Sequence, residues 1–332
     1  MERAYTFSDV LLVPKYSDIT SRKDVDLSTS LGPFNFTLPV VSANMKTITG
    51  PEMAVEMINN GGLGILHRFN SIVDNVNMFE QCRCKTIGVS IGVQEDDKDR
   101  FFQLYSAGAK VFCIDVAHGH HINVKKMLQW IKSQNIKDIY IIAGNIATGN
   151  AVYDLADWGA NCCKVGLGSG FSCQTRKNTG VGIPQLYALE MIKEQLNNQR
   201  LQVKLIADGG IRSVGDIAKA LKYADMVMLG YILSGLEETP GEIFDGVNGS
   251  PYKVYMGSAS SQNKLSSGQS TDYVEGIAIE VPYRGNVSRV LKRIKEGVQS
   301  AFSYVGAKNL KEFQKKAEFI YITDGARQES KI

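Results

Sequence analysis

The stretch that decides the fold is Val203-Lys-Leu-Ile-Ala-Asp-Gly-Gly-Ile-Arg-Ser-Val-Gly-Asp-Ile-Ala-Lys-Ala-Leu221. Its first part, Val203–Ala207, is an apolar run typical of a buried strand, and Asp-Gly-Gly then marks a turn. Residues Val214–Leu221 read as an amphipathic helix, and a second apolar run, Met226–Gly230, follows. This succession of strand, turn, helix and strand indicates a parallel α/β unit.

The same unit recurs along the chain. The apolar runs are nearly continuous rather than alternating, as expected of strands covered on both faces. Eight such units favour a closed (β/α)8 TIM barrel of class α/β, a single domain over residues 1–332, with an open doubly wound sheet as the alternative. The predicted strands are Leu38–Ala43, Gly62–Leu66, Thr86–Ile91, Lys110–Val116, Ile139–Gly144, Cys163–Gly168, Val203–Ala207 and Met226–Gly230, and the predicted helices include Pro51–Asn59, Asn123–Lys132, Ile183–Leu196 and Val214–Leu221.

Two segments lie outside the repeat. Residues 1–36 precede the first strand, and we expect them to cap the barrel. Residues 231–284 are rich in Gly, Ser and Tyr and are too long for an ordinary connection. A long segment after the eighth strand of a barrel predicts an extended active-site loop.

Composition excludes several classes of protein. The 332 residues are 44% hydrophobic and 21% charged, and 37 basic against 34 acidic residues give a net charge of +3. These values argue against disorder and against a nucleic-acid or membrane partner. The first residues lack the apolar core of a secretion signal. The six cysteines are too sparse for a disulfide scaffold or a clear zinc motif, which indicates a cytoplasmic protein with free thiols.

The strongest chemical signal is Gly166-Leu-Gly168-Ser-Gly170-Phe-Ser-Cys173-Gln-Thr175-Arg176. Glycines directly after a strand let the backbone approach an anion or turn its carbonyls toward a cation. Cysteine is usually buried, so Cys173 among polar and basic neighbours favours a nucleophile. The alternative is a tight turn with an incidental thiol.

A second signal is Asp208-Gly209-Gly210 after the seventh strand, together with Gly230 after the eighth. Barrels often bind a phosphate on these two loops, and an aspartate beside it can accept the hydroxyls of a ribose. Two glycine turns with a capping Asp are an equal alternative. No G-x-G-x-x-G fingerprint follows a strand with the expected acidic partner, so a Rossmann cofactor site is not predicted.

Other polar residues follow predicted strands. Asp115-Val-Ala-His118-Gly-His120-His121 suggests a metal site, but a polar strand end facing the active-site mouth fits better without a matching carboxylate motif. His67-Arg68 is interpreted as a structural or cofactor-edge pair. Asn44 and Asn145 need partners, either ligand atoms or their own turns.

These segments together resemble the IMP dehydrogenase/GMP reductase family. The resemblance runs from Phe7-Ser-Asp-Val-Leu-Leu-Val-Pro14 to about Tyr304-Val-Gly306, nearly the whole chain. It rests on the cysteine loop with Thr-Gly-Val-Gly at 179–182, Ala-Asp-Gly-Gly-Ile-Arg at 207–212 and Val-Pro-Tyr-Arg-Gly at 281–285. The resemblance implies a cytoplasmic homotetramer that acts on a purine nucleotide.

The family also implies roles for individual residues. Cys173 matches the cysteine that attacks C2 of the purine, and Thr175 and Glu275 match the proton-handling pair of the reductases. Gly166, Gly168 and Cys173 match the loop that holds a potassium ion. The substrate-binding matches are Asp208, Gly209, Gly210, Gly230, Tyr231, Gly257, Ser258, Ala259 and Gly276, and the cofactor-binding matches are Ser21, Arg22, Arg68, Asp115, Val116, Ala117, Val165, Gly166 and Asp272.

Two positions depart from the family pattern. Phe171 stands where family members often carry a serine that contacts the phosphate, so Ser169 or Ser172 is the expected substitute. Asp272 stands where animal-type reductases carry an arginine near the cofactor.

The flap decides between the family's two activities. A dehydrogenase hydrolyses its covalent intermediate with a long flap that carries an Arg-Tyr pair, whereas Ser261 to Val274 is short and contains no Arg. Residues 69–85 have room for one helix and for no regulatory CBS-type domain. We therefore expect the reductase activity, which converts GMP to IMP and ammonia with NADPH. The alternatives are an IMP dehydrogenase without the regulatory domain, favoured slightly by Gly61–Arg68, and a non-catalytic purine-nucleotide-binding barrel.

Overall fold

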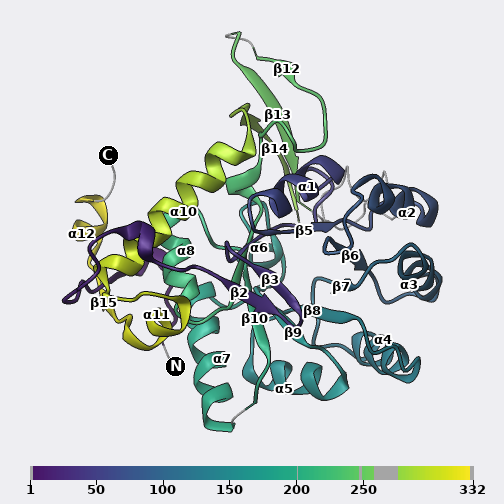
Figure 1. The fold of residues 1–332 in the computed structure, drawn as a ribbon, viewed down its shortest axis with the longest axis horizontal. Coiled ribbons are helices and arrows are strands. Elements are labelled where there is room, and N and C mark those ends of the chain that lie inside the picture. The colour runs from purple at the N-terminus through teal and green to yellow at the C-terminus, as the bar shows by residue number, and fades with distance from the viewer. Residues whose placement is uncertain (1–2, 200, 247–248, 258–275, 330–332) are drawn as a thin grey trace.

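The computed structural model describes residues 3–199, 201–246, 249–257 and 276–329. In this part of the chain, eight parallel strands close into a barrel, in which each strand pairs with its neighbours in sequence (Figure 1). The last strand returns to the first through Val227 opposite Val40. The predicted barrel is thus confirmed, and the open sheet is excluded. The strands are β4 (Val40–Ser42), β5 (Leu63–Leu66), β6 (Gly88–Ile91), β7 (Val111–Asp115), β8 (Tyr140–Ile146), β9 (Cys162–Val165), β10 (Lys204–Asp208) and β11 (Met226–Leu229).

Several strands end earlier than their apolar runs predict. The run 163–168 is strand only as far as Val165, because Gly166 turns the chain with a φ of +153°. A Cβ at Gly166 would lie 1.8 Å from the carbonyl oxygen of Asp208, so only glycine permits this approach. The turn directs the following loop over the mouth of the barrel.

Amphipathic helices cover the outside of the barrel. The helix α8 is typical: Ser213 and Asp216 form a capping box at its start, and Ile217, Ala220 and Leu221 are buried on its inner face. Helices α1 and α8 have the predicted bounds, and one helix, α2, lies between β5 and β6. The bounds are α1 (Pro51–Asn59), α2 (Ile72–Gln81), α3 (Asp96–Ser106), α4 (Ile122–Ser133), α5 (Gly149–Trp158), α7 (Gln185–Gln199), α8 (Val214–Leu221) and α10 (Val287–Tyr304).

A hairpin of β2 (Thr29–Leu31) and β3 (Phe34–Phe36) closes the amino-terminal end of the barrel. Leu31 and Phe36 are buried there, and Gly32 packs against the ring of Tyr140 at the start of β8. The expectation that residues 1–36 cap the barrel is met by this hairpin. It leaves the carboxyl ends of the strands as the open end.

The two flanks of the barrel also meet each other. Strand β1 (Val10–Leu12) pairs antiparallel with β15 (Phe319–Tyr321). Short helices stand on either side of this pair in the sequence: η1 (Phe7–Asp9), η2 (Arg22–Asp24), α11 (Leu310–Lys316) and α12 (Asp324–Glu329). Early and late segments therefore form one layer beside α8 and α10.

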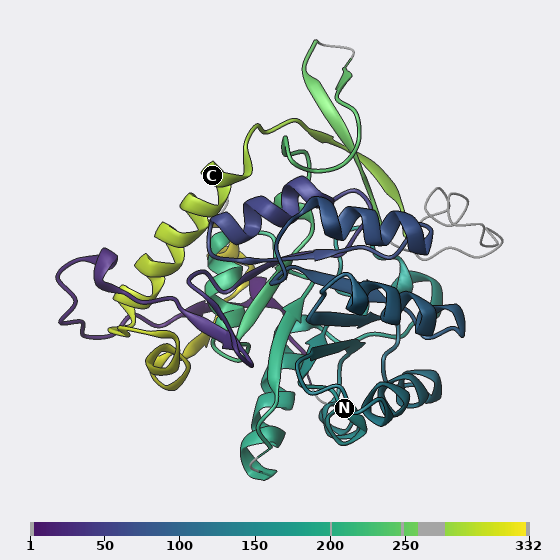
Figure 2. The same ribbon diagram turned by 45° about the vertical axis from the view of Figure 1, so that its right-hand side comes forward.

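The long segment after β11 contains more regular structure than we expected. It begins with the short helix η3 (Tyr231–Leu233), and its strands β12 (Phe244–Asp245), β13 (Pro251–Met256) and β14 (Ala278–Pro282) form an antiparallel sheet. This sheet projects from the barrel in two views (Figure 1 and Figure 2). Within the described ranges, no helix has both the length and the apolarity needed to cross a bilayer.

The contact between α1 and β5 gives a prediction about stability. A Cβ at Gly64 would lie 2.4 Å from the backbone Cα of Ala54, so Gly64→Ala forces α1 away from the sheet. We expect a loss of about 1–3 kcal/mol in the free energy of unfolding, measured by urea denaturation. The matched control is Gly215→Ala in α8, where the nearest atom is 3.6 Å away and stability should be unchanged or higher. Equal stability of the two variants would contradict this packing.

Candidate active site

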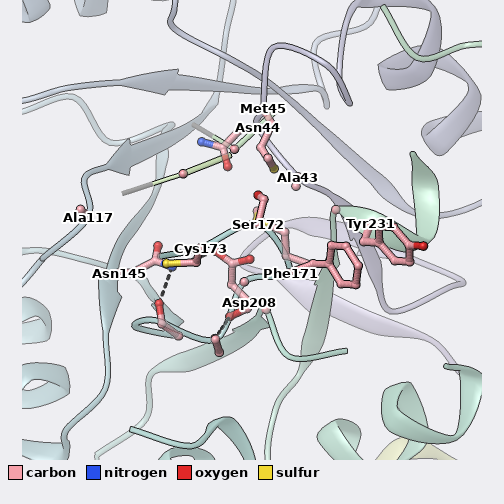
Figure 3. A pocket seen from close by; sticks show the side chains of 18 of the residues that line it. Ala43, Asn44, Met45, Ala117, Asn145, Phe171, Ser172, Cys173, Asp208 and Tyr231 are labelled. Carbon is pink, nitrogen blue, oxygen red and sulfur yellow. Dashed lines mark hydrogen bonds between the residues drawn. The ribbon is translucent and has the colours of Figure 1, made fainter. Parts of the chain in front are cut away.

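A cavity of about 380 Å³ opens at the carboxyl ends of the barrel strands (Figure 3). The loops after most strands contribute to its wall. The polar side chains in the wall include Asn44, Arg68, Asp115, Asn145 and Asp208. Ligands of barrel proteins bind at this end, so the cavity is the candidate site.

A buried lysine lies at the base of the cavity. Lys164 on β9 is 2% exposed, and its Nζ lies 3.0 Å from Oδ1 of Asp115 and 2.8 Å from Oδ2 of Asp208. It also donates a hydrogen bond to Oδ1 of Asn145. One cation therefore links the ends of β7, β8, β9 and β10.

The charges of this group stabilise one another. Burial alone would lower the pKa of Lys164, but the carboxylates of Asp208 and Asp115 outweigh burial and raise it. Burial alone would raise the pKa of Asp115, but Lys164 and Arg68 outweigh burial and lower it. The lysine is therefore charged and Asp115 ionised at neutral pH.

Asp208 keeps one oxygen for a ligand. Its Oδ2 accepts hydrogen bonds from Nδ2 of Asn145 at 2.8 Å and from Nζ of Lys164 at 2.8 Å. Among the described residues, nothing donates to its Oδ1. A carboxylate held on one side and free on the other, in the wall of a cavity, is suited to accept the hydroxyls of a ribose.

Cys173 lies on the loop after β9, beside a hydroxyl group. Its Sγ is 3.2 Å from Oγ1 of Thr175, the first residue of the short helix α6 (Thr175–Thr179). Cys173 also forms an isolated antiparallel bridge with Gly276, which holds the loop against the segment that precedes β14. The thiol is partly exposed in the cavity wall, as a nucleophile must be.

Four of the other five thiols differ from Cys173 because they are buried. Burial raises the pKa of Cys82, Cys113 and Cys163 to about 12, and it also raises that of Cys162. These cysteines stay protonated at neutral pH and face the packed interior. They are unsuited to nucleophilic chemistry.

Two aromatic rings stack at one end of the cavity. The ring centroids of Phe171 and Tyr231 are 3.8 Å apart, with an interplanar angle of 13°. The guanidinium carbon of Arg212 lies 5.5 Å from the centroid of Phe171. In Figure 3, Asp208 separates this pair from Asn145.

The comparisons with known proteins agree with this geometry. A sequence model of the IMP dehydrogenase / GMP reductase domain matches residues 4–332. The chain belongs to this family.

Its relatives include reductases from bacteria and from a protozoan. A GMP reductase of Variovorax paradoxus is 39% identical over 319 residues, which is 94% of each chain. A GMP reductase of Lactobacillus gasseri is 39% identical over 314 residues and 92% of each chain. A crystal structure of a cysteine-to-alanine variant of GMP reductase from Trypanosoma brucei with guanosine 5′-monophosphate has a TM-score of 0.94 and 26% identity, and covers 100% of this chain and 98% of that one.

Most residues that the family resemblance singles out lie around the cavity. Those in its wall are Arg68, Asp115, Val116, Ala117, Gly166, Gly168, Cys173, Thr175, Asp208, Gly209, Gly210, Gly230, Tyr231, Gly257 and Gly276. Val165 is buried behind the wall, where its carbonyl accepts a hydrogen bond from Gln185. Ser258, Ala259, Asp272 and Glu275 lie outside the described residues.

Ser21 and Arg22 are not in the cavity wall of their own chain. Ser21 caps η2, accepting a hydrogen bond from the backbone of Lys23, and η2 packs against α10. The structure therefore does not bring these two residues together with the other expected cofactor-binding residues.

None of the four histidines, all of which the structure describes, lines the cavity, and three of them have structural partners. His120 pairs with Asp154 at 2.6 Å, and His121 caps α4 by accepting from the backbone of Asn123. The strand end itself faces the mouth as expected, because Asp115, Val116 and Ala117 line the cavity, but the histidines that follow them do not. Burial lowers the pKa of His67 to about 4, with smaller effects of Lys46 and Arg100, so His67 is neutral.

Asn44 and Asn145 both have partners within the protein. Asn44 donates to Oγ of Ser90 at 2.8 Å, and Asn145 donates to the carbonyl of Gly166 at 2.7 Å. Both amides have protein partners and also line the cavity. They hold neighbouring strand ends together beside the ligand space.

Sequence reasoning missed Lys164, Arg212 and Tyr255 in the wall of the cavity. A usable signal existed for Lys164, because a lysine inside an apolar run faces either solvent or a buried counter-charge. Arg212 follows a predicted turn, and its direction depends on the fold.

Loss of the buried lysine should destabilise the protein in a pH-dependent way. Lys164→Met leaves Asp115 buried without its main counter-charge, and we expect a loss of about 3–5 kcal/mol in unfolding free energy at pH 7. Asp115 has a lowered pKa in the native protein, so its contribution is present at neutral pH and is lost as pH falls through that pKa. In the variant the pKa of Asp115 should rise, so the deficit should shrink as pH falls from 7 toward 5.

The control for this prediction is Lys204→Met on the adjacent strand. Lys204 also pairs with an aspartate, Asp225, at 2.8 Å, but its side chain is 40% exposed. Solvent screening limits that pair to about 0–1 kcal/mol. Urea denaturation of both variants at several pH values is the measurement, and a pH-independent deficit for Lys164→Met would refute the charge assignment.

Proposed function

We propose that this protein is a GMP reductase, an oxidoreductase that converts GMP to IMP and ammonia. The observation that carries the proposal is the position of Cys173, in the cavity wall beside the hydroxyl of Thr175. Relatives named GMP reductase at 38–39% identity over most of the chain support it. An IMP dehydrogenase without the regulatory domain and a non-catalytic nucleotide-binding barrel are the competing functions.

In this proposal Cys173 is the nucleophile. Its thiolate adds to C2 of the purine and forms a covalent bond, and the C2 amine leaves as ammonia after it gains a proton. The nicotinamide cofactor supplies hydride to C2 when bound. The carbon–sulfur bond then breaks, which releases IMP and restores the thiolate.

Thr175 and Glu275 are the proposed proton carriers. The Oγ1 of Thr175 lies within 3.2 Å of the sulfur, close enough to pass a proton to a leaving group on the same carbon. Glu275 immediately precedes Gly276, whose backbone is bridged to Cys173. The family resemblance assigns Glu275 this role.

Asp208 is the proposed ribose-binding residue. Its Oδ1 is free for a hydroxyl, while Asn145 and Lys164 fix the carboxylate through Oδ2. Gly209, Gly210, Gly230 and Tyr231 are proposed to bind the nucleotide beyond the ribose, and Gly257, Ser258, Ala259 and Gly276 the base.

For the cofactor we propose NADPH. Arg68 lines the cavity, and its guanidinium donates to the carbonyl of Asp115 at 3.1 and 3.3 Å, so the following residues Val116 and Ala117 lie beside a cation. From the family resemblance, we propose that Asp272 lies near the cofactor. Ser21 and Arg22 would reach the cofactor from a neighbouring copy in a homotetramer, with Arg22 available for the 2′-phosphate.

We further propose a cytoplasmic enzyme without nucleic-acid or membrane partners, in which residues 1–332 form one domain.

We propose a potassium ion in the loop after β9. Gly166 and Gly168 have φ values of +153° and +76°, and carbonyl oxygens are the ligands that potassium prefers. The carbonyl of Gly166 accepts one hydrogen bond, from Asn145, and a carbonyl has a second lone pair. The carbonyls of Gly166, Gly168 and Cys173 would hold the ion, which would order the loop that carries the thiol.

The first test of this function measures NADPH absorbance with GMP. We expect oxidation of NADPH with release of IMP and ammonia, and lower kcat/KM with NADH, because charged side chains discriminate for the extra phosphate. Production of XMP from IMP and NAD would establish the dehydrogenase instead. Nucleotide binding without turnover of either pair would establish the non-catalytic barrel.

The second test is Cys173→Ser. Removal of the nucleophile should lower kcat by several orders of magnitude, while GMP binding measured by calorimetry stays close to that of the native protein. Cys113→Ser is the control, since that thiol is fully buried and should affect stability alone. Turnover by Cys173→Ser within tenfold of the native rate would exclude the covalent mechanism.

A further inference from the structure

The end of the cavity beyond Asp208 has an unusual wall for an anion. Barrels commonly bind a phosphate on the loops after the seventh and eighth strands, here β10 and β11. In this protein the wall at that point includes the stacked rings of Phe171 and Tyr231. Aromatic faces carry partial negative charge and donate no hydrogen bonds to a phosphate.

The backbone N–H groups at the start of α8, which could otherwise bind a phosphate, already have a partner. The carboxylate of Asp216 accepts hydrogen bonds from the backbone N–H groups of Arg212 and Ser213, at 3.0 and 3.1 Å. It thereby fills the position where an external anion would meet the start of α8. The hydroxyl of Ser169 is likewise directed to Gln185 and to the carbonyl of Asp208.

The described part of the cavity wall contains three cationic residues, and Arg212 differs from the other two in having no described polar partner for its side chain. Lys164 is paired with two aspartates, and Arg68 donates to the backbone of Asp115. The guanidinium of Arg212 forms no ion pair with a described carboxylate, and it lies 5.5 Å from the ring centroid of Phe171. It is therefore a cation held by an aromatic face and available to an anion.

We propose that Arg212 binds the 5′-phosphate of the substrate and that the Phe171–Tyr231 stack positions its guanidinium for this contact. The inference rests on the proposed function, since it assigns the anionic end of the same nucleotide. The proposal also explains why Phe171 can replace the serine that family members often carry. A charged contact from Arg212 takes the place of that serine's hydroxyl, and neither Ser169 nor Ser172 is needed for it.

The order of groups along the cavity supports the assignment. In Figure 3, Asp208 lies between Asn145, which donates to it at 2.8 Å, and the Phe171–Tyr231 pair. A nucleotide with its base at Cys173 and its ribose at Asp208 directs its 5′ end toward the rings. A guanidinium can bind phosphate through two parallel hydrogen bonds, and an aromatic face beneath it reduces the entropy lost on binding.

The experiment measures GMP and guanosine binding to Arg212→Met by calorimetry, without cofactor. We expect GMP affinity to fall by about 10- to 100-fold, as for loss of a charge-assisted contact, and guanosine affinity to stay within about twofold. Arg212→Lys should recover only part of the loss, because a lysine has no planar fork. Arg289→Met, an exposed arginine on α10, is the control and should bind GMP normally.

A second variant tests the role of the rings. Phe171→Leu keeps an apolar side chain but removes the aromatic face, so GMP affinity should fall by a smaller factor than in Arg212→Met. Unchanged GMP affinity in Arg212→Met, or equal losses for GMP and guanosine, would overturn the assignment. Binding is measured without turnover, so this test does not depend on the proposed reductase activity. If GMP binding depends on Arg212 but NADPH is not oxidised, the proposed function is refuted and the assignment of Arg212 stands.

Discussion

The buried ion pairs of Lys164 are the interaction on which the open end of the barrel depends. A lysine 2% exposed to solvent is stable as a cation only because Asp115 and Asp208 lie within 3.0 Å of its Nζ. Those two carboxylates come from β7 and β10, and both line the ligand cavity. The same contact therefore joins strand ends and fixes the orientation of two binding groups.

A second constraint is the need for glycine where the backbone turns beside the cavity. Gly166 approaches the carbonyl of Asp208 so closely that no Cβ fits between them. This approach brings the loop that carries Cys173 next to the carboxylate that holds Lys164. The proposed nucleophile and the proposed ribose-binding group are thus positioned by main-chain contact, which is stiffer than contact through long side chains.

The sequence predicts the barrel well because its strands are buried on both faces. Their apolar runs and the amphipathic helices, such as α1 and α8, are local patterns that tertiary contacts reinforce. The strands β2, β3 and β12 were missed because they are short and partly exposed. The longer strands β13 and β14 were missed because few of their residues are buried, so they carry no continuous apolar signal.

Some residues of the candidate site could likewise be predicted from the sequence, and others could not. Cys173, Asp208 and their glycines stand out because unusual residues follow strands. Lys164 and Arg212 do not, because their roles depend on which carboxylates and rings the fold brings near them. Ser21 and Arg22 match a family pattern yet lie outside the cavity, because a match along the sequence does not reveal where the fold places a residue.

The bridge between Cys173 and Gly276 has a consequence for the order of folding. It joins a loop after β9 to a segment beyond β11 and β13, so it closes a long stretch of chain. Contacts of such large sequence separation form late, because the loop entropy is lost before the contact returns any free energy. A nascent or partly folded chain therefore contains the thiol of Cys173 but not the surroundings that the proposed chemistry needs, and these form only when the barrel has closed.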